Sequence, residues 1–287
     1  MELSAENIKE LIAKIIEHLS VEGSIEVAIE AVIEGLNIES DGVEFFKQFA
    51  EDSIELCVEG IYESTSEKLN DMEIVAILKS NEQLKNIVTE IIKSFARRNI
   101  IVEILVEEPS MENLLNTVLP QILPTGYELG RNCFVRPHQG KSDLQRSIPK
   151  KVTAYRHFPQ AVRLIVIQDQ DSNDCVILKQ NLIDLIRTQN LHQPYLVRIA
   201  CKELENWYLG DMQAIESIYP TFKATTHQKK AKYRHTDNIF GADDLERQIK
   251  DFSKGYASKN IPKNMILNKN TSPSFNQVLS GIEKFLN

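Results

Sequence analysis

Acidic side chains follow three apolar segments that have the composition of β-strands. Glu107 ends the first segment, Asp169 and Asp171 end the second, and Glu205 closely follows the third. In an α/β fold the ligand-binding crevice lies outside the carboxyl ends of the strands, so acids far apart in the sequence can converge there. Carboxylate oxygens are the hard ligands that Mg²⁺ prefers. The pattern therefore predicts phosphoryl-transfer chemistry on Mg²⁺ or Mn²⁺.

The first acidic segment also has a structural interpretation. Pro109 can open a helix, and the helix dipole favours acids in and before the first turn. This alternative applies to Glu107, Glu108 and Glu112. Both interpretations of the segment stay open.

The second and third acidic segments are equally open. Asp169 and Asp171 would point to the same side of an extended chain and could share one Mg²⁺ ion, but the same loop offers Ser172 or Asn173 as a helix cap. In the third segment, Asp211 more simply caps the helix that follows it. The remaining acids of the third segment that are candidates for the site are Glu205 and Glu203, beside the single tryptophan Trp207.

Basic residues gather between the first two acidic segments and could neutralise the phosphates of a nucleic acid. A solvated helical face is the alternative. The candidates for nucleic-acid binding are Lys141, Arg146, Lys150, Lys151 and Arg156, with Arg136 and His138 nearby. A second candidate patch comprises Lys229, Lys230, Lys232 and Arg234, with Tyr233 to stack on a base.

Charge and periodicity divide the chain near Asn99. Residues 1–99 contain 9 Lys and Arg against 21 Asp and Glu, a net charge of −12, whereas residues 100–287 have a net charge of +4. Apolar residues recur at three and four throughout residues 1–99, which predicts an acidic helical bundle suited to a protein partner. After Ile100, strands alternate with helices, which predicts a mostly parallel sheet with flanking helices. Residues 223–238 are polar and basic, and this composition predicts a surface loop.

Composition excludes several classes of protein. The chain is 42% hydrophobic and 26% charged, as in soluble globular proteins, and has no apolar run long enough for a membrane span. We therefore expect a cytoplasmic protein with no membrane partner. The four cysteines and six histidines are scattered without the spacing of a zinc site, and nothing favours a Ser-His-Asp triad.

Five motifs, taken together in this order, resemble an uncharacterised bacterial domain family within the Toprim superfamily. They are LVEEPS, HQGKSDL, DQDS, VRIACKELENWYLGD and SPSFNQVL, and the resemblance covers residues 100–287. Relatives of this family occur beside ATPases in defence loci. In Toprim proteins, which include topoisomerases, primases and overcoming-lysogenization-defect nucleases, a strand-end Glu acts in acid/base or metal chemistry and a DxD motif binds magnesium.

The resemblance implies a Toprim-like, Rossmannoid domain in which Glu107 has the first role and Asp169 with Asp171 binds Mg²⁺. A Gly usually follows the Toprim Glu, but Glu108 stands there in this chain. The register therefore lies between Glu107 and Glu108. We favour Glu107, because it directly follows the apolar pair Leu105 and Val106.

We accordingly predict a metal-dependent nuclease that acts on DNA or RNA, with Glu205 completing the acidic cluster, as an effector in antiphage defence. The bundle of residues 1–99, which resembles death-like or effector-associated domains, would recruit an ATPase or an immune sensor. The alternative is a catalytically inactive adaptor or regulatory protein that binds such a partner. A primase or nucleotidyl transferase finds less support, because no nucleotide-binding loop is visible.

Overall fold

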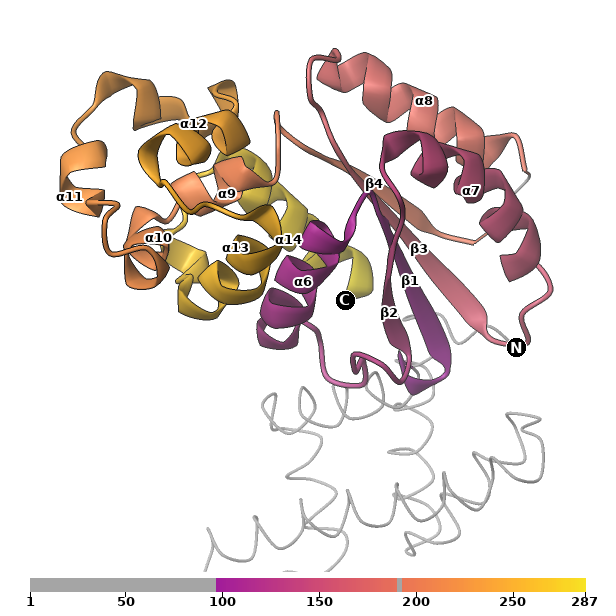
Figure 1. Ribbon diagram of the computed structural model, residues 1–287. Helices are drawn as coiled ribbons and strands as arrows, with labels where there is room; N and C mark the ends of the chain where they lie inside the picture. The colour runs from indigo at the N-terminus through magenta and orange to yellow at the C-terminus, as the bar shows by residue number, and fades with distance from the viewer. Residues whose placement is uncertain (1–96, 190–192) are drawn as a thin grey trace, which may run out of the picture. The chain divides into compact units, whose positions relative to one another are not determined.

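The computed structural model of the protein describes residues 97–189 and 193–287 (Figure 1). They include the second of the two compact units of the chain, Arg98–Asn287. The helical bundle predicted at the N-terminus lies outside the described residues, apart from residues 97–99. None of the helices in the described part of the chain is long and apolar enough to cross a membrane.

A four-stranded, all-parallel sheet lies at the centre of Arg98–Asn287, as the sequence predicts for an α/β domain. The strands are β1 (Ile100–Val106), β2 (Cys133–Pro137), β3 (Ala161–Asp169) and β4 (Tyr195–Ala200). Their order in the sheet is β2-β1-β3-β4. The carboxyl ends of all four strands therefore lie along one edge of the sheet.

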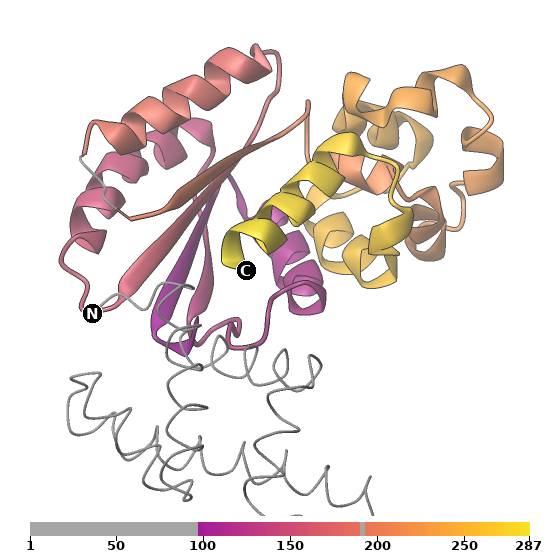
Figure 2. The ribbon, with the colours of Figure 1, turned by 180° about the vertical axis from the view of Figure 1, so that it is seen from behind.

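Helices cover both faces of the sheet (Figures 1 and 2). The helices α6 (Pro109–Val118) and α14 (Pro273–Leu286) pack into one apolar core, and α7 (Lys141–Tyr155) and α8 (Cys175–Arg187) pack into a second core on the opposite face. The sequence requires this arrangement because the strands are apolar on both sides. Ile104 of β1 belongs to the first core and its neighbour Leu105 to the second, and both are fully buried.

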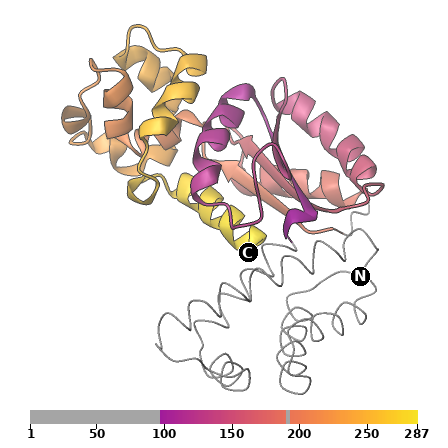
Figure 3. The same ribbon diagram turned by 90° about the horizontal axis from the view of Figure 1, so that it is seen from below.

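Short helices between β4 and α14 form what we call the helical lobe, residues 205–269. Figure 3 shows it on the side of the sheet that α6 and α14 cover, away from α7 and α8. Its elements are α9 (Glu205–Leu209), α10 (Met212–Ile218), α11 (Ala224–His227), η2 (Ala231–Asn238), α12 (Gly241–Gln248), α13 (Lys254–Asn260), η3 (Ile261–Asn264) and η4 (Leu267–Lys269). A further short helix, η1 (Leu119–Gln121), follows α6.

The prediction of a surface loop for residues 223–238 is wrong. The segment contains α11 and η2, and it buries His227, Tyr233 and Thr236. It lacks an apolar period because its helices are too short to repeat one, and because its buried residues are amphipathic. The ring of His227 stacks on that of Phe222, with 4.2 Å between the ring centroids.

Candidate functional site

The strand order places Glu107 beside Asp169. The chain leaves β1 toward β2 on one side and later returns to β3 on the other side, so the crevice of this α/β sheet opens between the carboxyl ends of β1 and β3. Glu107 follows β1 and Asp169 ends β3. The backbone N–H of Asp169 donates to Oε2 of Glu107 over 3.3 Å. The two acids thus meet at the position where such folds bind ligands.

Asp169 is a buried carboxylate with one unused oxygen. Its Oδ2 accepts a hydrogen bond from the backbone N–H of Leu204 (3.3 Å), whereas its buried Oδ1 has no hydrogen-bond partner. Burial raises the pKa of Asp169 well above its ordinary value, and the nearby Glu205 and Glu107 raise it further. The site therefore holds a buried carboxyl group that has a free acceptor oxygen and two acids as neighbours.

Glu205 is the second acid of this kind. It begins α9, is 1% exposed, and neither of its carboxylate oxygens has a hydrogen-bond partner. Its pKa is raised to about 7, chiefly by burial. Nζ of Lys254, from α13, lies 3.6 Å from Oε1 of Glu205 and opposes that rise. The role of Lys254 could not be predicted from the sequence, because this residue lies in a polar stretch without a motif.

Glu107 is half-buried and shares the environment of these acids. Burial, and then the charge of Asp171, raise its pKa to about 7. Glu108 lies near the same acids, because its charge raises the pKa values of Glu107 and Glu205, and its Oε1 accepts a hydrogen bond from Oγ of Ser110 (2.6 Å) at the start of α6. Of the two residues between which the sequence left the register open, Glu107 is the one in contact with β3.

Asp171 lies at the rim of the crevice. The prediction that it continues an extended segment is wrong, because its φ is 51°, in the left-handed region that Asp tolerates in turns. Its backbone N–H donates to the carbonyl of Lys202 (2.8 Å), and its Oδ2 pairs with Nζ of Lys141 over 2.9 Å. Asp171 remains close enough to Glu107 to raise its pKa.

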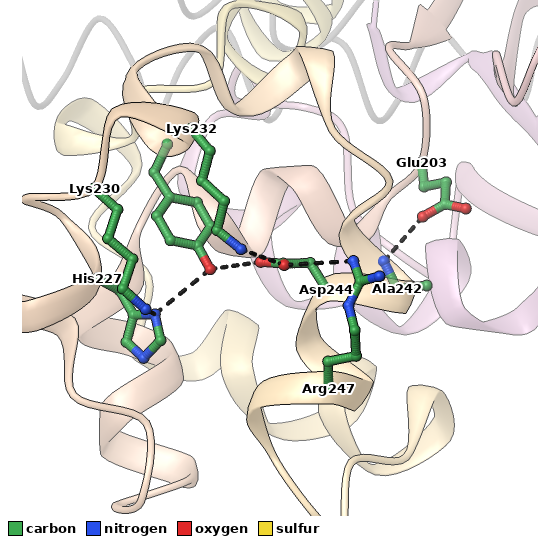
Figure 4. Close-up of polar contacts among 8 residues, drawn as sticks. Glu203, His227, Lys230, Lys232, Ala242, Asp244 and Arg247 are labelled. Atoms are coloured by element: carbon green, nitrogen blue, oxygen red, sulfur yellow. Dashed lines mark hydrogen bonds and ion pairs between the residues drawn. The ribbon is translucent and has the colours of Figure 1, made fainter.

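The other candidate acids have structural partners or positions. Oε2 of Glu203 accepts a hydrogen bond from the backbone N–H of Ala242 (2.9 Å), which ties the start of α12 to the end of β4 (Figure 4). Glu112 lies in the first turn of α6, the position that the structural interpretation predicted. Asp211 caps α10, as predicted.

The cap of α8 differs from the prediction. Its N-cap is Asp174, whose side chain accepts hydrogen bonds from the backbone N–H groups of Val176 and Ile177, both over 2.9 Å. Neither Ser172 nor Asn173 has this role. The left-handed turn at Asp171 moves the start of the helix further along the chain.

The predicted basic residues divide into two groups. Lys141, Arg146 and Lys150 are exposed along α7, Lys151 is half-buried, and Arg156 is exposed just beyond the helix. By contrast, Arg136 pairs with the buried Glu103 through two hydrogen bonds (2.9 and 3.1 Å), and the ring of His138 lies between the carbonyl of Val106 (2.8 Å) and Oγ of Ser147 (2.6 Å). Arg136 and His138 therefore serve the fold.

The second basic patch is also largely occupied. Lys232 and Arg247 both pair with the buried Asp244 (Figure 4), and the hydroxyl of Tyr233 donates to the same carboxylate (2.5 Å). Tyr233 is 6% exposed. The prediction that Tyr233 can stack on a base is wrong, because its ring is buried among the helices of the lobe.

The acids of the crevice suit a divalent cation in their chemistry. All the groups are carboxylates, the hard oxygen donors that Mg²⁺ and Mn²⁺ take, and three buried oxygens of Asp169 and Glu205 are without hydrogen-bond partners. Within residues 97–189 and 193–287, no three acidic, His or Cys side chains already stand in an arrangement that holds a metal ion. A metal would have to draw these side chains together.

Residues 106–283 match the family model described as "Domain of unknown function (DUF4276)", which spans more than half of the chain. The chain belongs to this family. The matched span of DUF4276 begins at the last residue of β1 and ends within α14, so it contains every acid of the crevice and the whole helical lobe. No curated protein and no solved structure is significantly similar to the chain.

Proposed function

We propose that this DUF4276 domain is Toprim-like and hydrolyses phosphodiester bonds of DNA or RNA with Mg²⁺ or Mn²⁺ held by the acids of the crevice. The proposal rests on one observation: the buried carboxylates of Asp169 and Glu205 leave three oxygens without hydrogen-bond partners, and, after burial itself, the charge of Glu205 raises the pKa of Asp169. Burying an ionised carboxylate costs several kcal/mol unless it is paired. A cation that takes these oxygens would offset this cost.

Asp169, Glu205 and Glu107 are the residues that would hold the ion, and Asp171 would join them from the rim. A bound Mg²⁺ or Mn²⁺ ion would supply a Lewis acid and lower the pKa of a bound water. Glu107 would help to activate an attacking water or would hold a second ion. Lys141 stands at the rim, where its ammonium group could hold a phosphate of the substrate.

Substrate and partner binding would be divided along the chain. The exposed cations of α7 lead away from Lys141 and would hold the nucleic-acid backbone. Residues 1–99, with their net charge of −12, would repel nucleic acid and recruit a protein partner. A defence ATPase or an immune sensor as that partner, and antiphage defence as the role, complete the proposal.

Cleavage assays with purified full-length protein test the proposal. Labelled single- and double-stranded DNA and RNA are incubated with Mg²⁺ or Mn²⁺, and with EDTA. We expect ion-dependent cleavage that falls about 100-fold or more in Glu107→Gln and in Asp169→Asn, by analogy with the loss of one charge-stabilising group from an active site. Glu112→Gln is the matched control, because Glu112 lies in the first turn of α6 and takes no part in the hydrogen bonds of Glu107 and Asp169, so this variant should cleave normally. Cleavage by wild type that survives both substitutions would reject the site, and no cleavage of any substrate would favour the adaptor.

A further inference from the structure

The helical lobe contains a cavity that shares no residue with the acidic crevice. Its volume is about 460 Å³, which lies within the range of small-molecule sites. Its walls come from the junction of α9 and α10, from η2, and from the segment between η3 and α14. The residues on which the proposal depends are Met212, Gln213, Arg234, Ile266 and Lys269.

The first wall of the cavity is preformed. Gly210 allows the chain around Asn270 to approach α9, because a Cβ at Gly210 would collide with the side chain of Asn270. Nδ2 of Asn270 donates to the carbonyl of Trp207 (2.8 Å), and the backbone N–H of Thr271 donates to the carbonyl of Gly210 (2.9 Å). These bonds fix the wall before any ligand binds, so little ordering opposes binding.

The wall formed by η2 is fixed by the network around Asp244. Tyr233 lines the cavity, and its hydroxyl donates to Asp244. Lys232 also pairs with Asp244, which is seen between Lys232 and Arg247 in Figure 4. The ammonium group of Lys232 is therefore paired with Asp244, whereas the guanidinium group of the neighbouring Arg234 lines the cavity.

The cavity is positively charged. Arg234 and Lys269 both line it, and within the described part of the chain neither side chain has a hydrogen bond or an ion pair. Asp211 is the one acid among the lining residues, and its two oxygens already accept hydrogen bonds from the backbone N–H groups of Ala214 (3.3 Å) and Ile266 (2.8 Å). An anion in the cavity would therefore contact two cations, and it would not face a carboxylate oxygen that lacks a hydrogen bond.

Apolar side chains stand beside these cations. Met212 is buried in the lobe, whereas Ile266 is 47% exposed. Gln213 is exposed on α10 and adds an amide that can donate and accept hydrogen bonds. A cavity with two cations and an apolar surface suits a ligand with an anionic end and an apolar or aromatic body.

We propose that the cavity binds a small phosphorylated molecule with an apolar or aromatic body, of the size of a nucleoside monophosphate. Arg234 and Lys269 hold the phosphate, because a guanidinium group and an ammonium group together match the charge of a phosphate dianion. Ile266 and Met212 contact the body of the ligand, and Gln213 bonds to its polar edge. The site is separate from the proposed nuclease centre and does not require it to be active.

Isothermal titration calorimetry on the full-length protein tests this proposal, in EDTA so that metal binding does not contribute. The probes are AMP, adenosine and inorganic phosphate, with a short 5′-phosphorylated oligonucleotide to distinguish a free nucleotide from the end of a strand. We expect saturable binding of AMP that is tighter than that of adenosine or phosphate. Arg234→Gln with Lys269→Gln should weaken AMP binding by about tenfold or more, because it removes both cations that hold the phosphate.

Two further variants keep the test independent of folding. Lys229→Gln with Lys259→Gln also removes two exposed cations, but from outside the cavity, and should leave the Kd for AMP unchanged. Gln213→Trp keeps both charges and fills the cavity with an indole ring, so it should abolish AMP binding. Tighter binding of the oligonucleotide than of AMP would assign the cavity to a strand end bearing the same phosphate. Absence of AMP binding, or equal loss in the cavity and control double variants, would overturn the proposal.

Discussion

Asp169 in the crevice and Asp211 in the helical lobe are buried to the same degree, each 8% exposed, yet their surroundings differ. Both oxygens of Asp211 accept hydrogen bonds from backbone N–H groups, one of them at the start of α10. Asp169 has one such bond, one unused oxygen and the two acids Glu107 and Glu205 as neighbours. At equal burial, therefore, both oxygens of Asp211 are bonded, whereas Asp169 keeps an unused oxygen and a raised pKa.

The same difference separates the two regions as a whole. In the helical lobe, Asp244 is held by Lys232, Arg247 and Tyr233, and the pKa of its carboxyl group is lowered. At the crevice, burial raises the pKa values of Asp169, Glu107 and Glu205, and among the described residues only Lys254 forms an ion pair with one of these three acids, Glu205. The carboxylate of Asp244 is therefore fully paired, whereas three buried oxygens of Asp169 and Glu205 have no hydrogen-bond partner.

The largest expected effect on stability comes from substitution of Asp244, whose carboxylate is fully paired. Asp244→Ala removes the partner of a buried hydroxyl and of two cations, so it should lower the free energy of unfolding by about 3–5 kcal/mol. Urea denaturation measures this change. Asp243→Ala, at the exposed neighbouring position in the first turn of α12, should cost far less. Similar losses in the two variants would mean that the network does not stabilise the lobe.

The free energy of unfolding should depend on pH because of the crevice acid Glu205. The folded pKa of Glu205, about 7, exceeds the ordinary value of 4.5, so the folded chain binds this proton more tightly than the unfolded chain does. In the absence of metal, the free energy of unfolding should therefore fall as pH rises from about 5 to about 7.5, by on the order of 3 kcal/mol. Glu205→Gln should flatten this part of the profile. A wild-type profile that is flat or rises in this window would contradict the raised pKa.

A smaller effect compares the two aspartates directly. At pH 8.5 without metal, Asp169→Asn removes a charge that repels Glu107 and Glu205, and should raise the free energy of unfolding by about 1–2 kcal/mol. Asp211→Asn should lower it by a similar amount, because an amide has one acceptor oxygen and would place its NH2 group against the backbone N–H of Ala214 or Ile266. Denaturation curves of both variants against wild type give the signs. Destabilisation by both substitutions would remove the distinction between the two acids.

The sheet and its acids were predictable because their signals are local. The apolar runs at β1, β3 and β4 predict strands buried on both faces, and the apolar residues of α14 (Pro273–Leu286) recur at the spacing of a helix. Once these strands were assigned, the acids at their carboxyl ends could be predicted to lie close together. The strand order that brings Glu107 to Asp169 has no local signal, because it depends on which strands pair.

The helical lobe was not predictable in the same way. Its helices are short, and contacts between distant residues position them: Nε1 of Trp207 donates to Oγ of Ser274 (2.9 Å), and Oγ of Ser272 donates to Oδ1 of Asp237 (2.6 Å). Lys254 of α13 and Glu205 of α9 lie close together only in the folded lobe. A polar stretch therefore contained both a buried structural network and a cation of the site, and neither produces a periodic pattern.

Binding of Mn²⁺ tests most directly whether the unpaired acids of the crevice form a metal site. Titration of the full-length protein with Mn²⁺ at pH 7.5, followed by calorimetry and by thermal unfolding, should show saturable binding and a rise in Tm. Asp169→Asn with Glu205→Gln should abolish both, whereas Glu112→Gln should retain them. If wild type and the double variant bind Mn²⁺ equally, or if wild type binds none, the crevice acids are not a metal site and the account is wrong.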